Sequence, residues 1–128
     1  MEFHETSLRG SGSLLPLGKL AMESYRARPA EKFMVPCITL DAYAKGASLD
    51  CLWLDVQGAE LLVLKGAERL LPNVRSIFVE VSVRPELYRG SATFAEIDSL
   101  LRGFGFQLAL LGLDKAVLTG NAFYIRTH

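Results

Sequence analysis

The segment from Cys51 to Leu71 constrains the fold most, because an apolar run is followed there by a glycine turn and a helical pattern. Every residue of 51–54 is apolar, which is typical of a strand buried on both faces by crossover helices. Helical spacing begins at Gly58, continues to Leu71 and stops at Pro72. This order predicts an α/β sheet, and such sheets bind ligands beside the carboxyl ends of their strands.

The same patterns predict further elements on both sides of this segment. They are a short strand at 2–6, a helix within 17–28, a strand at 34–40, a short helix at 42–45, a strand at 76–83, a helix that starts at the capping-box pair Thr93 and Glu96 and ends at Gly103, and strands at 106–111 and 121–127. About nine residues separate the last two strands, too few for a helical crossover, so these strands should be antiparallel neighbours. We therefore predict the second half of a doubly wound α/β sheet, mostly parallel and ending in an antiparallel strand pair.

Length and composition indicate a single domain. The chain has 128 residues, of which 50% are apolar, enough for one compact core. We expect an irregular lead-in over 1–33 and an α/β core over 34–128. Lys and Arg number 14, as do Asp and Glu, so no global charge steers the chain to nucleic acid or to an anionic membrane.

The sequence also favours a cytoplasmic protein. No window has the roughly 18 apolar residues of a membrane-spanning helix, and the N-terminus lacks the pattern of a secretory signal. The two cysteines, Cys37 and Cys51, lie in apolar strand-like runs and not in a CxxC pair. We therefore expect both to be reduced thiols buried in the core.

Two carboxylates are unexpected for a purely structural core. Glu60 falls at the head of the apolar stripe of its helix, where free amides and the positive dipole end stabilise a carboxylate by roughly 0.3–1 kcal/mol. Asp55 ends the preceding strand, at the sheet edge toward which Glu60 should point. Structural roles are the alternatives: Glu60 could serve the helix end alone, and Asp55 could accept hydrogen bonds from the turn amides of Gly58 and Ala59.

A third carboxylate, Glu80, interrupts the next apolar strand. A carboxylate in such a strand must be paired, hydrogen-bonded or near the open end. Its alternatives are a role in the same ligand site and a hydrogen bond to a neighbouring loop. The loop that follows carries Arg84, Tyr88 and Arg89, which could clamp an anionic substrate or could simply be solvated.

Other motifs are excluded by their context. The glycines at 10–12 lack a preceding buried strand, and those at 103–105 follow a helix and precede a strand, the reverse of a nucleotide-binding loop. His4 and His128 lie far apart, so we expect no metal site. No Ser or Cys lies in a nucleophile elbow. A phosphate-handling enzyme that uses Asp55 with a metal would need further carboxylates, which the sequence pattern does not supply.

The sequence resembles the FkbM-type methyltransferase family. The resemblance is carried by TLD at 39–41, LDVQGAE at 54–60, LKGA at 64–67, VEV at 79–81 and GFGF at 103–106, with GSLL at 12–15 similar to the serine-rich loop of the family. It extends from about residue 3 to residue 125. It implies a partial Rossmann-like class I methyltransferase fold and S-adenosylmethionine as cofactor.

The resemblance also implies roles for individual residues. Asp55 and Glu60 would face the cofactor and acceptor pocket, and Glu80 would end the next strand. Trp53 stands where the family often has lysine, and Gln57 where it often has glutamate, so both positions lack a charge near the site. The first strand of the family, its glycine-rich turn and its ribose-binding acid have no counterpart before residue 34. This predicts the C-terminal portion of such a domain, either as a fragment of a longer enzyme or as a naturally short relative.

Two functions follow as hypotheses. The first is O-methylation of a small-molecule or sugar hydroxyl, in which Asp55 and Glu80 are the candidate catalytic bases. Substrate contacts would come from the candidate residues Glu60, Gln57, Arg84 and Tyr88, and cofactor contacts from Asp55 and Val56. The second is a non-catalytic Rossmann-like remnant that binds a partner or self-associates as a homo-oligomer through an exposed sheet edge beside 51–56. Neither hypothesis involves nucleic acid or a membrane.

Overall fold

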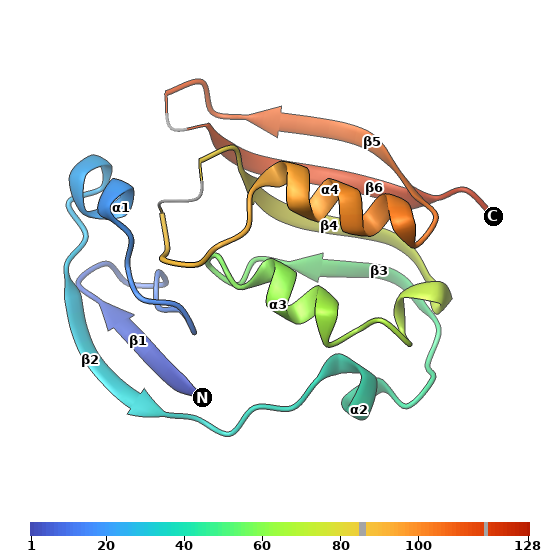
Figure 1. Ribbon diagram of the computed structural model, residues 1–128, viewed down its shortest axis with the longest axis horizontal. Coiled ribbons are helices and arrows are strands. Elements are labelled where there is room, and N and C mark those ends of the chain that lie inside the picture. Colours follow the sequence, from blue (N-terminus) through green and yellow to red (C-terminus); the bar gives the residue numbers. More distant parts are fainter. Residues whose placement is uncertain (85–86, 117) are drawn as a thin grey trace.

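The structure is a computed structural model that describes residues 1–84, 87–116 and 118–128 and contains two sheets (Figure 1). The smaller sheet pairs β1 (Glu2–Thr6) with β2 (Pro29–Met34) in antiparallel orientation. The larger sheet has the strand order β3-β4-β6-β5, where the strands are β3 (Leu49–Leu54), β4 (Val74–Ser82), β5 (Phe106–Leu113) and β6 (Thr119–Arg126). The helices are α1 (Lys19–Ser24), α2 (Leu40–Ala44), α3 (Glu60–Lys65) and α4 (Phe94–Gly103), with a 3-10 helix η1 (Leu71–Asn73).

The larger sheet is mixed, and the prediction of a mostly parallel sheet is wrong. Only β3 and β4 are parallel, whereas β6 lies antiparallel to both β4 and β5. The cause is the return of the chain after β5, which inserts β6 between β4 and β5. A Cβ atom at Gly120 would lie 1.8 Å from the Gly112 carbonyl oxygen, so the close approach of β6 to β5 at this point requires glycine. The predicted antiparallel pairing of the last two strands is confirmed.

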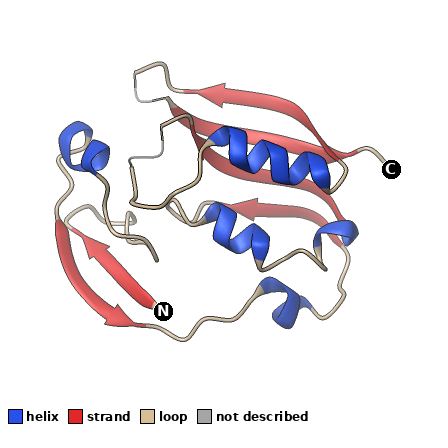
Figure 2. Cartoon of the chain, viewed as in Figure 1, coloured by secondary structure: helices blue, strands red, loops and turns tan. Residues whose placement is uncertain are grey.

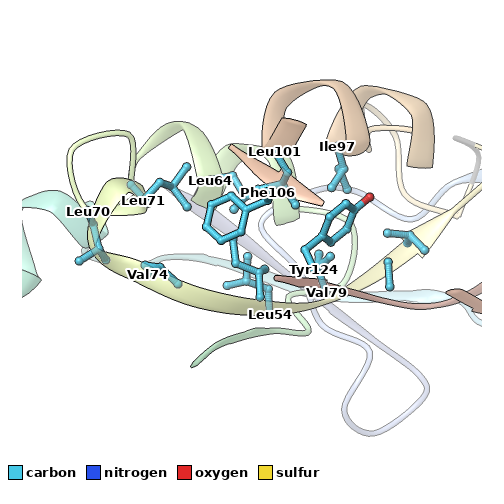
Figure 3. Close-up of a cluster of buried hydrophobic side chains, with 14 residues drawn as sticks. Leu54, Leu64, Leu70, Leu71, Val74, Val79, Ile97, Leu101, Phe106 and Tyr124 are labelled. Carbon is cyan, nitrogen blue, oxygen red and sulfur yellow. The ribbon is translucent and has the colours of Figure 1, made fainter. Parts of the chain in front are cut away.

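Helices α3 and α4 both lie against one face of this sheet (Figure 2). Figure 3 shows the core between them and the strands, where Leu64 and Leu101 from the helices meet Val79 and Tyr124 from the sheet. All four of these side chains are fully buried. Burying them provides roughly 1.5–3 kcal/mol for each aliphatic side chain, which is the main force that holds the sheet to its helices.

The opposite face of the sheet is uncovered near β3, contrary to the expectation of a strand buried on both faces. Trp53 is 69% exposed, and its ring packs against Phe78 at a centroid distance of 4.4 Å. Cys51 is exposed on the same strand. Cys37 is exposed as well, in the irregular stretch between β2 and α2, so the prediction of two core thiols is wrong.

The predicted helix at 58–71 is shorter than its pattern. Helix α3 ends at Lys65, and turns lead from there to η1. The Arg69 amide donates to the carboxylate of Asp41 at 3.1 Å, and the Leu70 amide donates to the same carboxylate at 2.8 Å and to the Ala67 carbonyl at 2.9 Å. Because Asp41 comes from a distant part of the chain, helical periodicity alone gave no sign of this end.

The first third of the chain is more regular than the predicted lead-in. Strand β2 occupies 29–34, so the predicted strand at 34–40 is wrong. Pro36, which lacks an amide hydrogen, lies just beyond the end of β2. The predicted strand at 2–6 and the capping box of Thr93 and Glu96 are confirmed. None of the described helices is long and apolar enough to cross a membrane.

Candidate functional site

Asp55 and Glu60 flank the turn between β3 and α3. The carboxylate Oε1 of Glu60 accepts hydrogen bonds from the backbone amides of Val56, at 3.0 Å, and Gly58, at 3.3 Å. Glu60 is only 5% exposed, so these bonds compensate in part for burying its charge. Burial raises the pKa of Glu60 above its ordinary value, the backbone hydrogen bonds oppose the rise, and the charge of Asp55 adds to it.

Asp55 remains exposed and is held by its neighbour. The Gln57 side chain donates from Nε2 to Oδ1 of Asp55 at 2.6 Å. Of the two turn amides that were expected to donate to Asp55, that of Gly58 donates to Glu60 and that of Ala59 to the Val56 carbonyl, so Asp55 is left accessible at the strand end. Gln57 itself has a φ of 52°, a left-handed conformation that costs energy for a residue other than glycine.

Glu80 lies on β4 beside the carboxyl end of β3, half-buried between Val79 and Val81. Burial raises the pKa of Glu80 to about 7, and the charges of Asp55 and Glu60 and a hydrogen bond with Asp55 add to this rise. One carboxylate oxygen from each of the three acids lies within 4.8 Å of the other two. The structure thus brings together the three carboxylates that the sequence singled out.

The N-terminal segment closes one side of this group. The hydroxyl of Ser13, which is buried, donates to the Gln57 carbonyl at 2.7 Å and accepts from the Leu15 amide at 2.9 Å. The Tyr88 hydroxyl lies 2.9 Å from both Oε1 of Gln57 and the carbonyl oxygen of Ser11, so its single hydrogen is shared between two acceptors. These bonds tie the loop before α1 to the turn after β3.

Tyr88 is a buried wall of the site and not an exposed loop residue. A Cβ atom at Gly58 would lie 2.8 Å from the Cβ of Tyr88, so only glycine allows the two segments to pack together. Burial and the three nearby carboxylates raise the pKa of Tyr88 to about 12, which keeps it a hydrogen-bond donor at neutral pH. Its partner Gln57 is half-buried.

The remaining candidate residues lie differently. Val56 contributes its backbone amide to Glu60 and is half-buried. Arg84 is exposed, and its backbone amide donates to the Ser82 hydroxyl at 3.2 Å. Its side chain does not line either of the two hollows that adjoin the carboxylates. Arg89 lines a separate hollow on the side of β1 and β2. Arg84 and Arg89 are thus not brought to the carboxylates.

Two hollows adjoin the group. One is a cavity of about 40 Å³ lined by Glu60, Glu80, Gly58 and Tyr88 together with apolar residues of β4 and α4. This space suffices for an ordered water molecule. The other, of about 290 Å³, extends from Glu80 and Gln57 toward α1 and is open to solvent. Glu80 therefore lines both hollows, whereas Glu60 lines only the smaller one.

The chain itself is similar to known proteins. A family model described as a methyltransferase FkbM domain matches residues 4–108, most of the chain. This chain belongs to the FkbM methyltransferase family. The FkbM chain is also 42% identical over 57 residues to the 2-O-methyltransferase NoeI of Sinorhizobium fredii (strain NBRC 101917 / NGR234). That similarity covers 44% of the chain and 23% of the relative. No solved structure matches the chain.

The three carboxylates of this FkbM domain have the chemistry of a cation site or of a shared proton. Oxygen ligands this close suit a hard divalent cation such as Mg²⁺ or Ca²⁺. Glu60 and Glu80 are the further carboxylates that a metal at Asp55 would need, although the sequence was not expected to supply them. Without a cation, mutual repulsion favours a proton on one of them, and Glu80 is the acid whose pKa rises to about 7.

The methyl donor implied by the family fits these residues only in part. A carboxylate group gives a favourable potential for a cationic sulfur. The turn amides of Val56 and Gly58, however, are already taken by Glu60, and no described lining residue of the two hollows is Lys, Arg or His. The described lining residues thus suit the cationic sulfur of S-adenosylmethionine but offer no cation to its carboxylate.

The sequence did not predict the hydrogen bonds of Ser11 and Ser13 to the site, nor the hydrogen bond between Tyr88 and Gln57. For the serines, the resemblance of residues 12–15 to a serine-rich loop was the only indication. Tyr88 and Gln57 are 31 positions apart, so no local pattern predicts that they meet.

Proposed function

We propose that this chain carries the acceptor side of an O-methyltransferase site, where Glu80 removes the proton of a hydroxyl group during methylation. The observation that carries the proposal is the convergence of Asp55, Glu60 and Glu80 in a member of a methyltransferase family, with the pKa of Glu80 raised to about 7. A general base acts best when its pKa lies near the working pH. Glu80 is therefore a better candidate for this role than the exposed Asp55.

In this reaction the hydroxyl oxygen of the acceptor passes its proton to the Glu80 carboxylate. The electron pair of the broken O–H bond would stay on oxygen and form the new bond to the methyl carbon, while the carbon–sulfur bond of a bound methyl donor would break and leave its electron pair on sulfur. Asp55, oriented by Gln57, lies beside Glu80 and favours its protonated form by charge and by a hydrogen bond. Small-molecule and sugar hydroxyls are both compatible with this chemistry, and the relative NoeI bears the name of a 2-O-methyltransferase.

The test is methyl transfer from S-adenosylmethionine, at millimolar concentration, to glucose and to benzyl alcohol. Replacing Glu80 with Gln should lower kcat by roughly 10²–10⁴-fold, the usual contribution of a general base, and leave the KM for the donor unchanged. Glu68→Gln is the matched control, because Glu68 is an exposed carboxylate that follows α3. Transfer that is equally fast in both variants, or no transfer by the folded wild-type chain, contradicts the proposal.

A second function is favoured by the uncovered sheet face beside β3. Trp53, Cys51 and Ile125 are exposed there, and an apolar face of this kind supports self-association into a homo-oligomer. This binding role is compatible with catalysis, since it uses a different surface of the larger sheet.

A further inference from the structure

The hollow of about 290 Å³ beside the carboxylates has chemistry that selects its ligand. We infer that it receives an alcohol with an apolar body and no anionic group, whose hydroxyl faces Glu80. This inference rests on the proposed function and specifies its substrate class.

The walls of the hollow are mainly apolar. They are formed by Leu8, Leu17, Ala21, Tyr25, Ala27 and Leu87. Leu17, Ala21 and Ala27 belong to a small second core around Tyr88, so this wall is fixed by packing. Leu8 and Tyr25 are 41% and 44% exposed and form its outer part. Apolar walls with a few polar groups at one end are typical of small-molecule sites, because burial provides affinity and the polar groups provide orientation.

The polar groups that line the hollow are the acceptors of Glu80 and Gln57 and the hydroxyls of Tyr88, Ser11 and Thr119, and none of them carries a positive charge. Glu80 and the side-chain oxygen of Gln57 are acceptors, and the Tyr88 hydroxyl donates to acceptors of the protein. A ligand hydroxyl can donate to Glu80. A carboxylate or phosphate would find no cation, because no described residue of this wall is Lys, Arg or His. It would also be repelled by Asp55, Glu60 and Glu80.

The size of the hollow limits the ligand further. Its volume lies at the lower end of the range of small-molecule sites, which is roughly 300–1,000 Å³. One ring or a short branched chain therefore fits, with the rest of a larger molecule outside, past Leu8 and Tyr25.

The experiment measures binding separately from methyl transfer. ¹⁵N amide shifts of the full chain at pH 8 are followed during titration with benzyl alcohol, benzoate and glucose. Benzyl alcohol should shift the amides of Ala21 and Ala27 and bind at least tenfold more tightly than benzoate or glucose. Glu80→Gln should reduce the difference in affinity between benzyl alcohol and benzoate, because this variant removes the nearest negative charge.

Two leucines of similar exposure supply the matched variants. Leu8→Ser should weaken benzyl alcohol binding severalfold, whereas Leu62→Ser, on α3 and 44% exposed, should leave it unchanged. Leu8 is accessible enough for its replacement to spare the fold, and Tyr25→Ser gives a second check on the same wall.

Benzoate or glucose binding as tightly as benzyl alcohol, shifts confined to other parts of the chain, or equal effects of the two leucine variants would each overturn the inference. Binding of benzyl alcohol in the hollow without methylation of any alcohol would support this ligand class and overturn the proposed function. The two failures are therefore distinguishable.

Discussion

Gln57 connects Asp55 with Tyr88 in the site. Its amide nitrogen donates to Asp55 and its amide oxygen accepts from Tyr88, so both ends of the side chain are engaged. The Tyr88 hydroxyl also contacts the Ser11 carbonyl, which extends the connection to the N-terminal segment. Gln57 was a candidate substrate contact, but these bonds give it a positioning role at Asp55.

Replacing Gln57 with Glu should destabilise the folded chain most at high pH. The variant loses the donor to Asp55 and adds a fourth carboxylate, so we expect a loss of about 1–3 kcal/mol in the free energy of unfolding at pH 8. At pH 5 the loss should be smaller, because protons relieve the repulsion. Urea unfolding at both pH values measures the difference.

Gln107→Glu is the matched control for this variant, because Gln107 is exposed on β5 and away from the acids. Equal losses in the two variants, or a loss in Gln57→Glu that does not depend on pH, would show that the amide bridge has no special role.

The acids of the site were predictable residue by residue, but their arrangement was not. Strand ends placed Asp55 and Glu80 at one edge, and helical spacing placed Glu60 nearby. Which acid accepts the turn amides depends on the conformation of the turn itself, including the left-handed backbone of Gln57. A sequence pattern carries no information at that level of detail.

For helices and strands, sequence patterns correctly predicted those features that depend on residues close together in the chain. Helix α4 begins at its capping box, in which Thr93 and Glu96 bond each other's backbone amides. The short connection between β5 and β6 correctly predicted their antiparallel pairing. Helix α3 was predicted too long because Asp41, 28 residues before Arg69, accepts the amides that a longer helix would have used.

The faces of the larger sheet were mispredicted for a similar reason. The apolar run at 51–54 reads as a strand covered on both sides, yet α3 and α4 share one side and leave Trp53 exposed. An apolar residue indicates that burial would be favourable, but it does not indicate whether another helix or strand covers that face. The apolar run therefore predicted the strand but not which of its faces would be covered.

For the whole molecule, the uncovered face predicts self-association. Wild-type protein should sediment faster as its concentration rises, and Trp53→Lys should shift this transition to concentrations at least tenfold higher. Tyr43→Lys is the control, since Tyr43 is 75% exposed on α2 and not on this face. Sedimentation velocity decides the matter: a wild-type chain that stays monomeric at all concentrations contradicts the prediction.

The stability of the whole chain should also report on the acids. The pKa of Glu80 rises from 4.5 to about 7 in the folded state. Between these pH values the folded chain binds a proton that the unfolded chain lacks. This stabilisation is fully present below pH 4.5 and is lost as the pH rises through 7, so the free energy of unfolding should fall across this window.

The most direct test of the site is the titration of the Glu80 carboxyl carbon by ¹³C NMR in metal-free buffer. We expect a midpoint near 7, and a lower midpoint in Asp55→Asn, because this variant removes a neighbouring charge while the burial of Glu80 is unchanged. Glu68→Gln should leave the midpoint unchanged. A wild-type midpoint near 4.5 would rule out the proposed role of Glu80, because this residue would then be an ordinary carboxylate and a poor proton acceptor at neutral pH.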